Sequence, residues 1–328
     1  MKRWFRSGAL VLALVLCLGL TACSGGNEST GDGKYKVGIS QLVTHEALDE
    51  ATRGFQDALN EKLPGQVEFD YQNAANDPAT CATIANGFVA ANVDLIMANA
   101  TPALQAAATA TADIPILGTS VTEYGVAFGI ENFSGTLGTN VSGTSDLAPL
   151  DQQAAMIRDW CPEAKTVGLL YCANEPNSQY QVDTVQAELE KLGYTCTQYS
   201  FADSNDVAAV CQAAVAGSDV LYVPTDNTCA SNANLIDNVC RPAKTPVFTG
   251  EEGPCRRCGV ATLSISYYDI GYQTGEMAAK VLTGETKISE MPIEYAPAFT
   301  PKYNPDICAE LGLTPPDDGY VALDTSAQ

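Results

Sequence analysis

The chain has 328 residues, a formal net charge of −22, one histidine and twelve cysteines. A chain this acidic lacks the basic footprint that nucleic acid requires. Its lone histidine, His45, excludes a His-rich metal site and leaves Ser-His-Asp or Cys-His catalysis with a single candidate. With 46% hydrophobic and 17% charged residues, the composition is typical of a globular protein of about two domains.

Residues 1–22 are predicted to be an export signal. A basic start precedes a 13-residue apolar run, Gly8–Leu20, which is shorter than the roughly 20 residues needed to span a bilayer. The run ends in Leu20-Thr21-Ala22-Cys23, which resembles the lipobox at which bacterial lipoproteins are cut and lipidated. We therefore expect lipidation at Cys23 and an extracytoplasmic position on the cell membrane. The alternative is an ordinary secreted protein with an incidental cysteine.

Residues 23–34 are rich in Gly, Ser and Thr and are predicted to form a flexible tether. Cys17 leaves with the signal and Cys23 carries lipid, so ten cysteines remain. An even number in an oxidising compartment favours disulfides. Cys255-Arg256-Arg257-Cys258 is a single CxxC motif without a second pair at zinc spacing. We expect no metal and no cofactor.

Strand and helix patterns alternate along the rest of the chain. Strands are predicted at 36–40, 66–71, 94–98 and 114–117, with helices at 48–63, 78–91 and 102–111 between them. The pattern restarts with strands at 166–171, 195–201, 219–223 and 246–248 and helices at 178–192, 207–215 and 233–239. This order predicts an α/β fold of two Rossmann-like lobes, each a parallel sheet flanked by helices, with a ligand cleft between them.

The C-terminal part indicates that the chain passes between the lobes more than once. A helix is predicted at 268–282, a strand at 293–299 and a short helix at 306–311. The N-terminal lobe is expected to comprise residues 35–144 plus about 269–296, and the C-terminal lobe 145–268 plus about 297–328.

Seven stretches resemble the ABC-transporter substrate-binding proteins of the tryptophan/tyrosine-type family. They are residues 37–49, 71–74, 100–102, 140–147, 171–178, 222–228 and 267–271. The resemblance implies a type I periplasmic-binding-protein fold with a three-strand hinge and a small, often aromatic, amino acid as ligand. It also implies that the first loop, near Leu42, supplies a wall of the cleft.

Most of these stretches follow a predicted strand and precede a helix, where a ligand can meet free backbone N–H groups. Hydroxyls and amides could hold a ligand carboxylate, and an acid its ammonium. The main candidates are Thr101, Asn177 and Ser178 for the carboxylate and Asp226, then Glu175, for the ammonium. Asp146 could reach the cleft from the first crossing between lobes. Each of these could instead cap a helix or, for Glu175, lie on the loop surface.

Further candidates lie on neighbouring loops. Thr119 and Ser120 end the fourth strand, Glu251 follows strand 246–248, and Tyr268 could stack on an aromatic ligand or pack at the hinge. His45 is expected to be structural, with cleft lining as the alternative. The predicted ligand-binding residues are Leu42, Thr101, Thr119, Ser120, Asp146, Glu175, Asn177, Ser178, Asp226, Glu251 and Tyr268.

These features predict a lipid-anchored binding component of an ABC importer, working with a membrane permease and an ATPase. The chain itself has no GxxxxGK[ST] phosphate loop. One alternative is a sensing protein that reports the ligand to a membrane receptor. An exported enzyme is disfavoured because the chain has no GxSxG or HExxH motif and no second histidine.

Overall fold

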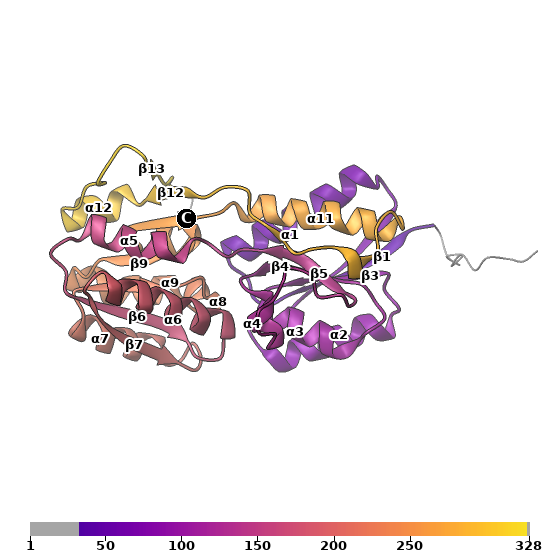
Figure 1. Cartoon of the computed structure of the whole chain (residues 1–328), viewed down its shortest axis with the longest axis horizontal. Coiled ribbons are helices and arrows are strands. Elements are labelled where there is room, and N and C mark those ends of the chain that lie inside the picture. Colours follow the sequence, from indigo (N-terminus) through magenta and orange to yellow (C-terminus); the bar gives the residue numbers. More distant parts are fainter. Residues whose placement is uncertain (1–32, 327–328) are drawn as a thin grey trace, which may run out of the picture. The chain divides into compact units, whose positions relative to one another are not determined.

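The computed structural model describes residues 33–326. The predicted signal (1–22), Cys23 and nearly all of the tether (23–34) lie outside the described residues. From Lys34 onward the chain forms one compact unit. It contains two sheets, and each sheet with its covering helices is called a lobe below (Figure 1).

The N-terminal lobe is built on a six-stranded sheet in the order β11-β5-β4-β3-β1-β2, in which every pair is parallel. Its central strands are buried on both faces, as expected of parallel strands covered by helices, and β3 is largely apolar. The strands are β1 (Tyr35–Gln41), β2 (Val67–Asn73), β3 (Leu95–Asn99), β4 (Ile116–Val121), β5 (Val141–Ser145) and β11 (Glu294–Tyr295).

Helices cover both faces of this sheet. They are α1 (Glu46–Lys62), α2 (Pro78–Ala90), α3 (Thr101–Ala110), α4 (Tyr124–Phe128) and α11 (Tyr267–Leu282), followed by the 3-10 turn η1 (Ile288–Glu290). Figure 1 shows α1 and α11 side by side on one face. Their backbones approach so closely that a Cβ on Gly271 would lie 2.0 Å from the carbonyl oxygen of Ala51. The absence of a side chain at Gly271 therefore allows α11, which follows a strand of the other lobe, to pack closely against α1 of the N-terminal lobe.

The C-terminal lobe has a seven-stranded sheet in the order β13-β12-β10-β9-β8-β6-β7, in which β12 is antiparallel to β10. Its strands are β6 (Thr166–Cys172), β7 (Thr195–Phe201), β8 (Val220–Val223), β9 (Val247–Thr249), β10 (Ala261–Ser264), β12 (Thr300–Tyr303) and β13 (Val321–Ala322). Its helices are α5 (Leu150–Trp160), α6 (Pro176–Lys191), α7 (Val207–Gly217), α8 (Asn227–Ser231), α9 (Ala233–Ala243), α10 (Glu252–Cys258) and α12 (Pro305–Leu311).

Three segments of the described chain connect the lobes, after β5, after β10 and after β11. The predicted strand at 293–299 is wrong beyond its start, because only Glu294 and Tyr295 pair with β5. Residues 296–299 form the third connection, where Pro297 cannot donate a ladder hydrogen bond. The two α/β lobes with parallel-dominated sheets confirm the predicted fold class.

The prediction of paired cysteines needs correction. All ten cysteines in the described part of the chain are free thiols. Even the sulfurs of Cys211 and Cys240, on α7 and α9, lie 3.5 Å apart, well beyond the roughly 2.05 Å of a disulfide. Most of the ten are buried among apolar side chains, as small hydrophobic residues are. Cys255 and Cys258 lie within α10.

Candidate functional site

The candidate site is a narrow cleft between the lobes, at the carboxyl ends of the parallel strands. It leaves no space wide enough for a water molecule, so the lobes must separate to admit a ligand. No Lys or Arg is among the lining residues. They are His45, Leu48, Ser120, Thr122 and Asp146 from the N-terminal lobe and its first exit, Asn177, Thr225, Asn227 and Glu251 from the C-terminal lobe, and Tyr267 at the start of α11.

Two buried carboxylates in the cleft lack partners. Glu251, the N-cap residue of α10, is 1% exposed, and neither of its oxygens accepts a hydrogen bond. Asp146, directly after β5, is 3% exposed; its Oδ2 accepts from the Tyr267 hydroxyl at 3.0 Å, and its Oδ1 has no partner. A buried, unpaired carboxylate is costly. The arrangement therefore suits a ligand that brings a cation and hydrogen-bond donors.

The electrostatics follow from this burial. Burial raises the pKa of Glu251 well above its ordinary value of 4.5, and the Asp146 carboxylate raises it further. Burial also raises the pKa of Asp146, against the stabilising effect of the nearby Thr122 and Tyr267 hydroxyls. Burial lowers the pKa of His45, which favours the neutral ring. The cleft thus offers acids and no side-chain cation.

Ser120 contributes a free hydroxyl from the N-terminal lobe. It is buried, its Oγ has no hydrogen-bond partner, and its φ of 54° lies in the left-handed region. The pairing of β4 with β5 shifts register between Gly118 and Val121, around this residue. A strained residue of this kind is a marker of function. Asn177, from α6, adds an unpartnered Oδ1.

Two further buried acids near the cleft are fully engaged in holding the fold. Asp226 accepts from the backbone N–H of Cys229, as the cap of α8, and from that of Cys172 on β6, both at 2.7 Å. Glu175 accepts from the backbone N–H of Asn227 at 3.0 Å and of Thr228 at 2.9 Å, and from both side chains. Burial, with the nearby Glu175 carboxylate, raises the pKa of Asp226. Neither residue lines the cleft.

The structure brings together four of the predicted ligand-binding residues: Ser120, Asp146, Asn177 and Glu251. The other seven do not line the cleft. Leu42 packs in the apolar core, and Thr119 contacts Thr144 inside the sheet. Thr101 begins α3, and Ser178 is buried on α6. Glu175 and Asp226 accept hydrogen bonds from backbone N–H groups, and Tyr268 lies on α11 under Arg53.

Several lining residues were missed by sequence reasoning or assigned a structural role. Tyr267 rather than its neighbour Tyr268 faces the cleft, because one residue along a helix turns the side chain by about 100°. Thr225 and Asn227, which line the cleft, flank the predicted Asp226, which does not. Leu48 and Thr122 carried no distinguishing signal, and His45 lines the cleft while also bonding across it.

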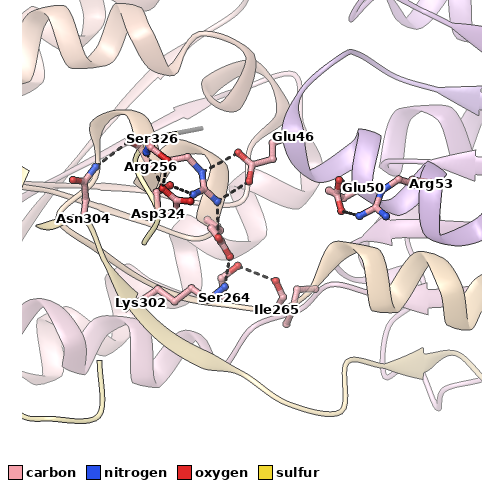
Figure 2. Close-up of polar contacts among 11 residues, drawn as sticks. Glu46, Glu50, Arg53, Arg256, Ser264, Ile265, Lys302, Asn304, Asp324 and Ser326 are labelled. Atoms are coloured by element: carbon pink, nitrogen blue, oxygen red, sulfur yellow. Dashed lines mark hydrogen bonds and ion pairs between the residues drawn. The ribbon is translucent and has the colours of Figure 1, made fainter. Parts of the chain in front are cut away.

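Direct contacts join the lobes around the cleft. His45 Nε2 lies 3.2 Å from Asn227 Oδ1, and Asn76 Nδ2 donates to the Thr228 hydroxyl at 3.0 Å. At one edge Arg256 of α10 reaches Glu46 of α1 at 2.9 Å (Figure 2). Arg256 also pairs with Glu252 at 2.7 Å within its own lobe.

A larger hollow lies elsewhere, on the N-terminal lobe beside α3 and α4. Its volume is about 680 Å³, and it is lined by residues such as Ala108, Phe128, Ile130 and Leu137, with no titratable side chain. It therefore lacks groups to recognise a charged ligand. Within residues 33–326, no helix is long and apolar enough to cross a membrane. In the same range, no group of three or more His, Cys, Asp or Glu side chains could hold a metal ion.

Two sheet-and-helix lobes joined by three segments, with a polar cleft between them, define a two-lobed binding protein of the type I periplasmic class. A solute-binding protein from Bacillus halodurans with bound myo-inositol shares this fold at 14% identity and a TM-score of 0.62, covering 86% of this chain and 99% of its own. The family model for ABC transporter substrate binding protein matches residues 36–323. The chain belongs to this family, whose members are extracytoplasmic binding proteins and not enzymes.

Other relatives are more similar to this chain in sequence than the myo-inositol-binding protein is. A "Tyrosine-binding protein" of Clostridioides difficile (strain R20291) is 37% identical over 298 residues, covering 87% of this chain and 86% of the relative. The ABC domain of Streptococcus pneumoniae in complex with L-Trp superposes with a TM-score of 0.82 at 32% identity, covering 86% of this chain and 95% of that one. The ligand-free, open structure of a substrate-binding protein with adhesive properties from Clostridium difficile is 38% identical but gives a TM-score of 0.67, covering 89% and 100%.

Proposed function

We propose that this protein is the lipid-anchored, extracytoplasmic solute-binding component of an ABC importer and that it binds an aromatic amino acid in the cleft between its lobes. The observation that carries the proposal is the set of buried, unpartnered polar atoms in the cleft, on Glu251, Asp146, Ser120 and Asn177. A free amino acid supplies an ammonium group for the acids and a carboxylate for the hydroxyl.

Glu251 is the proposed ammonium partner, in place of Asp226. Both Glu251 oxygens are free, whereas both Asp226 oxygens already accept backbone N–H groups. The Ser120 hydroxyl, from the opposite lobe, donates to the ligand carboxylate. Because the two groups come from different lobes, an amino acid bridges them and favours the closed arrangement.

The comparison with relatives supports a closed arrangement in this structure. The open relative has the higher identity but the lower TM-score, 0.67 at 38%, against 0.82 at 32% for the L-Trp complex. When the lobes of two proteins are similar but the whole chains superpose less well, the lobes differ in their placement relative to each other. The names of the tyrosine-binding protein of Clostridioides difficile and of the L-Trp complex point to aromatic amino acids. The flat ring of Tyr267 in the cleft offers such a ligand a stacking surface.

Membrane attachment and partners are the remaining parts of the proposal. The lipobox-like Leu20–Cys23 and the tether would keep the folded body near the membrane, where a permease reads the closed form and an ATPase supplies energy. Cys23→Ser should release the protein from the membrane fraction. A chain that stays bound after this change would contradict the lipid anchor. A sensing role would require a receptor in place of the permease. Loss of ligand uptake in a strain that lacks this protein would argue against a sensing role.

The ligand class is tested by a thermal-shift screen of the purified protein against the twenty amino acids, nucleosides and simple sugars. A ligand at a hundredfold excess over its Kd stabilises the fold by about 2.7 kcal/mol. We expect aromatic amino acids to raise the melting temperature, and Glu251→Gln to abolish the rise. Glu285→Gln, on an exposed turn after α11, makes the same change in charge and should leave it intact. A rise with sugars or nucleosides alone would overturn the assignment.

A further inference from the structure

The cleft holds one more hydrogen-bond acceptor than the head group of an amino acid uses. An α-ammonium group has three N–H donors. The C-terminal lobe presents three unpartnered acceptor atoms to match them: Oε1 and Oε2 of Glu251 and Oδ1 of Asn177. The Ser120 hydroxyl of the N-terminal lobe can donate to the ligand carboxylate. The Oδ1 atom of Asp146 is then left over.

Asp146 differs from Glu251 in where it lies and in how much of it is free. It directly follows β5 at the first exit from the N-terminal lobe, and its Oδ2 is occupied by the Tyr267 hydroxyl at 3.0 Å. A single free oxygen suits a ligand group with a single donor better than an ammonium group. The Thr122 hydroxyl lies close enough to favour the ionised carboxylate, but Oδ1 accepts no hydrogen bond.

The surroundings of Asp146 are those of a ring-binding end. Tyr267 is the only residue with a six-membered aromatic ring among the lining residues, and its hydroxyl contacts Asp146 directly. Leu48 supplies the apolar side chain of the lining set. A ligand ring stacked on Tyr267 therefore has its edge near the Asp146 carboxylate.

Resting on the proposed function, we infer that Asp146 is a specificity-determining residue that accepts a hydrogen bond from the ring of the ligand. The ligand class is thus narrowed to aromatic amino acids with a ring donor, the phenol O–H of tyrosine or the indole N–H of tryptophan. Phenylalanine has neither donor and would leave the buried Oδ1 of Asp146, a residue that is 3% exposed, unpaired on closure. Sites built around such a bond reject analogues that lack the donor.

The test measures the Kd values of tyrosine, tryptophan and phenylalanine by calorimetry for the purified protein and two variants. We expect tyrosine or tryptophan to bind about 10- to 100-fold more tightly than phenylalanine, the range of a hydrogen bond to a charged group. Asp146→Ala should reduce this ratio to within about threefold by weakening the donor-bearing ligands selectively. Glu251→Gln should weaken all three ligands and leave the ratio unchanged. Because the readout is a ratio within one protein, partial loss of folded protein does not alter it.

Two results would overturn the inference and leave the proposed function standing. One is equal affinity of the unchanged protein for phenylalanine and tyrosine. The other is an equal loss for all three ligands in Asp146→Ala, which would place the ammonium group on Asp146. Binding of none of the three, with a good response to another compound class, would overturn the proposed function itself.

Discussion

The ion pair between Glu46 and Arg256 should stabilise the closed form without touching the ligand. Glu46 begins α1 in the N-terminal lobe and Arg256 lies on α10 in the C-terminal lobe, with 2.9 Å between their atoms (Figure 2). Opening the lobes separates these elements. Any free energy in this contact therefore belongs to the closed state, and Glu46→Gln should weaken ligand binding by destabilising closure.

The expected magnitude is modest. The Arg256 side chain is 10% exposed, but that of Glu46 is 43% exposed, so water screens the pair. Arg256 keeps Glu252 as a partner in the variant, and Lys302 also contacts Glu252, so no buried charge is left alone. Partly exposed pairs of this kind contribute about 0.5–1 kcal/mol. At 25 °C, this corresponds to a two- to fivefold rise in Kd.

A matched control lies one turn further along the same helix. Glu50 pairs with Arg53 within α1 (Figure 2), so Glu50→Gln removes the same charge without affecting a contact between lobes. Calorimetry should show an increased Kd for Glu46→Gln alone, and the difference should shrink in 1 M salt, where the Debye length falls to about 3 Å. Equal Kd values for the two variants would refute the role of the pair in closure. So would a difference between their Kd values that persists at high salt.

Three further outcomes are expected. Burial in the cleft raises the pKa of Glu251, so protonation should favour the form in which Glu251 is buried. The radius of gyration of the ligand-free protein should therefore fall as the pH drops from 8 toward 5, and it should fall less in Glu251→Gln. Asp226→Ala should lower the unfolding free energy by about 2–5 kcal/mol, since two buried N–H groups lose their acceptor, with a Kd within twofold of the original. Gly271→Ala should cost about 3 kcal/mol in a urea melt because its Cβ would meet Ala51, whereas Gly87→Ala, in open space on α2, should not destabilise.

Much of the fold could be predicted because several of its core strands are short, mostly apolar runs. Leu95–Asn99 and Val220–Val223 are buried throughout and were found to within a residue. The strand β5 was missed because Val141–Ser145 is rich in small and polar residues. Its Gly143 has a φ of 145°, and a Cβ there would lie 2.0 Å from the Gly118 carbonyl oxygen. The close approach of β4 and β5 requires small residues in β5. A search for hydrophobic periodicity does not detect a strand of that composition.

The predicted candidates and the cleft in the structure agree more in location than in individual residues. The candidates were chosen at strand ends that precede helices, and the cleft lies at such ends. Which of the acids keep free oxygens depends on contacts that the sequence does not show. Asp226 and Glu251 each follow a buried strand and precede a helix, yet only Asp226 receives backbone N–H groups. A capping acid and an acid with free oxygens differ in their hydrogen-bond partners, which are set by the tertiary structure.

Under the proposed function, the acidity of the cleft explains how binding and closure would be linked. Closing the lobes around Glu251 and Asp146 without a ligand buries carboxylate oxygens that have no partner, so water in the open form competes with the closed form. A ligand with an ammonium group and a ring donor supplies both missing partners at once. A ligand lacking either group leaves one acid unsatisfied. Selectivity is therefore exerted through closure: the better a ligand pairs these acids, the larger the fraction of closed protein it sustains.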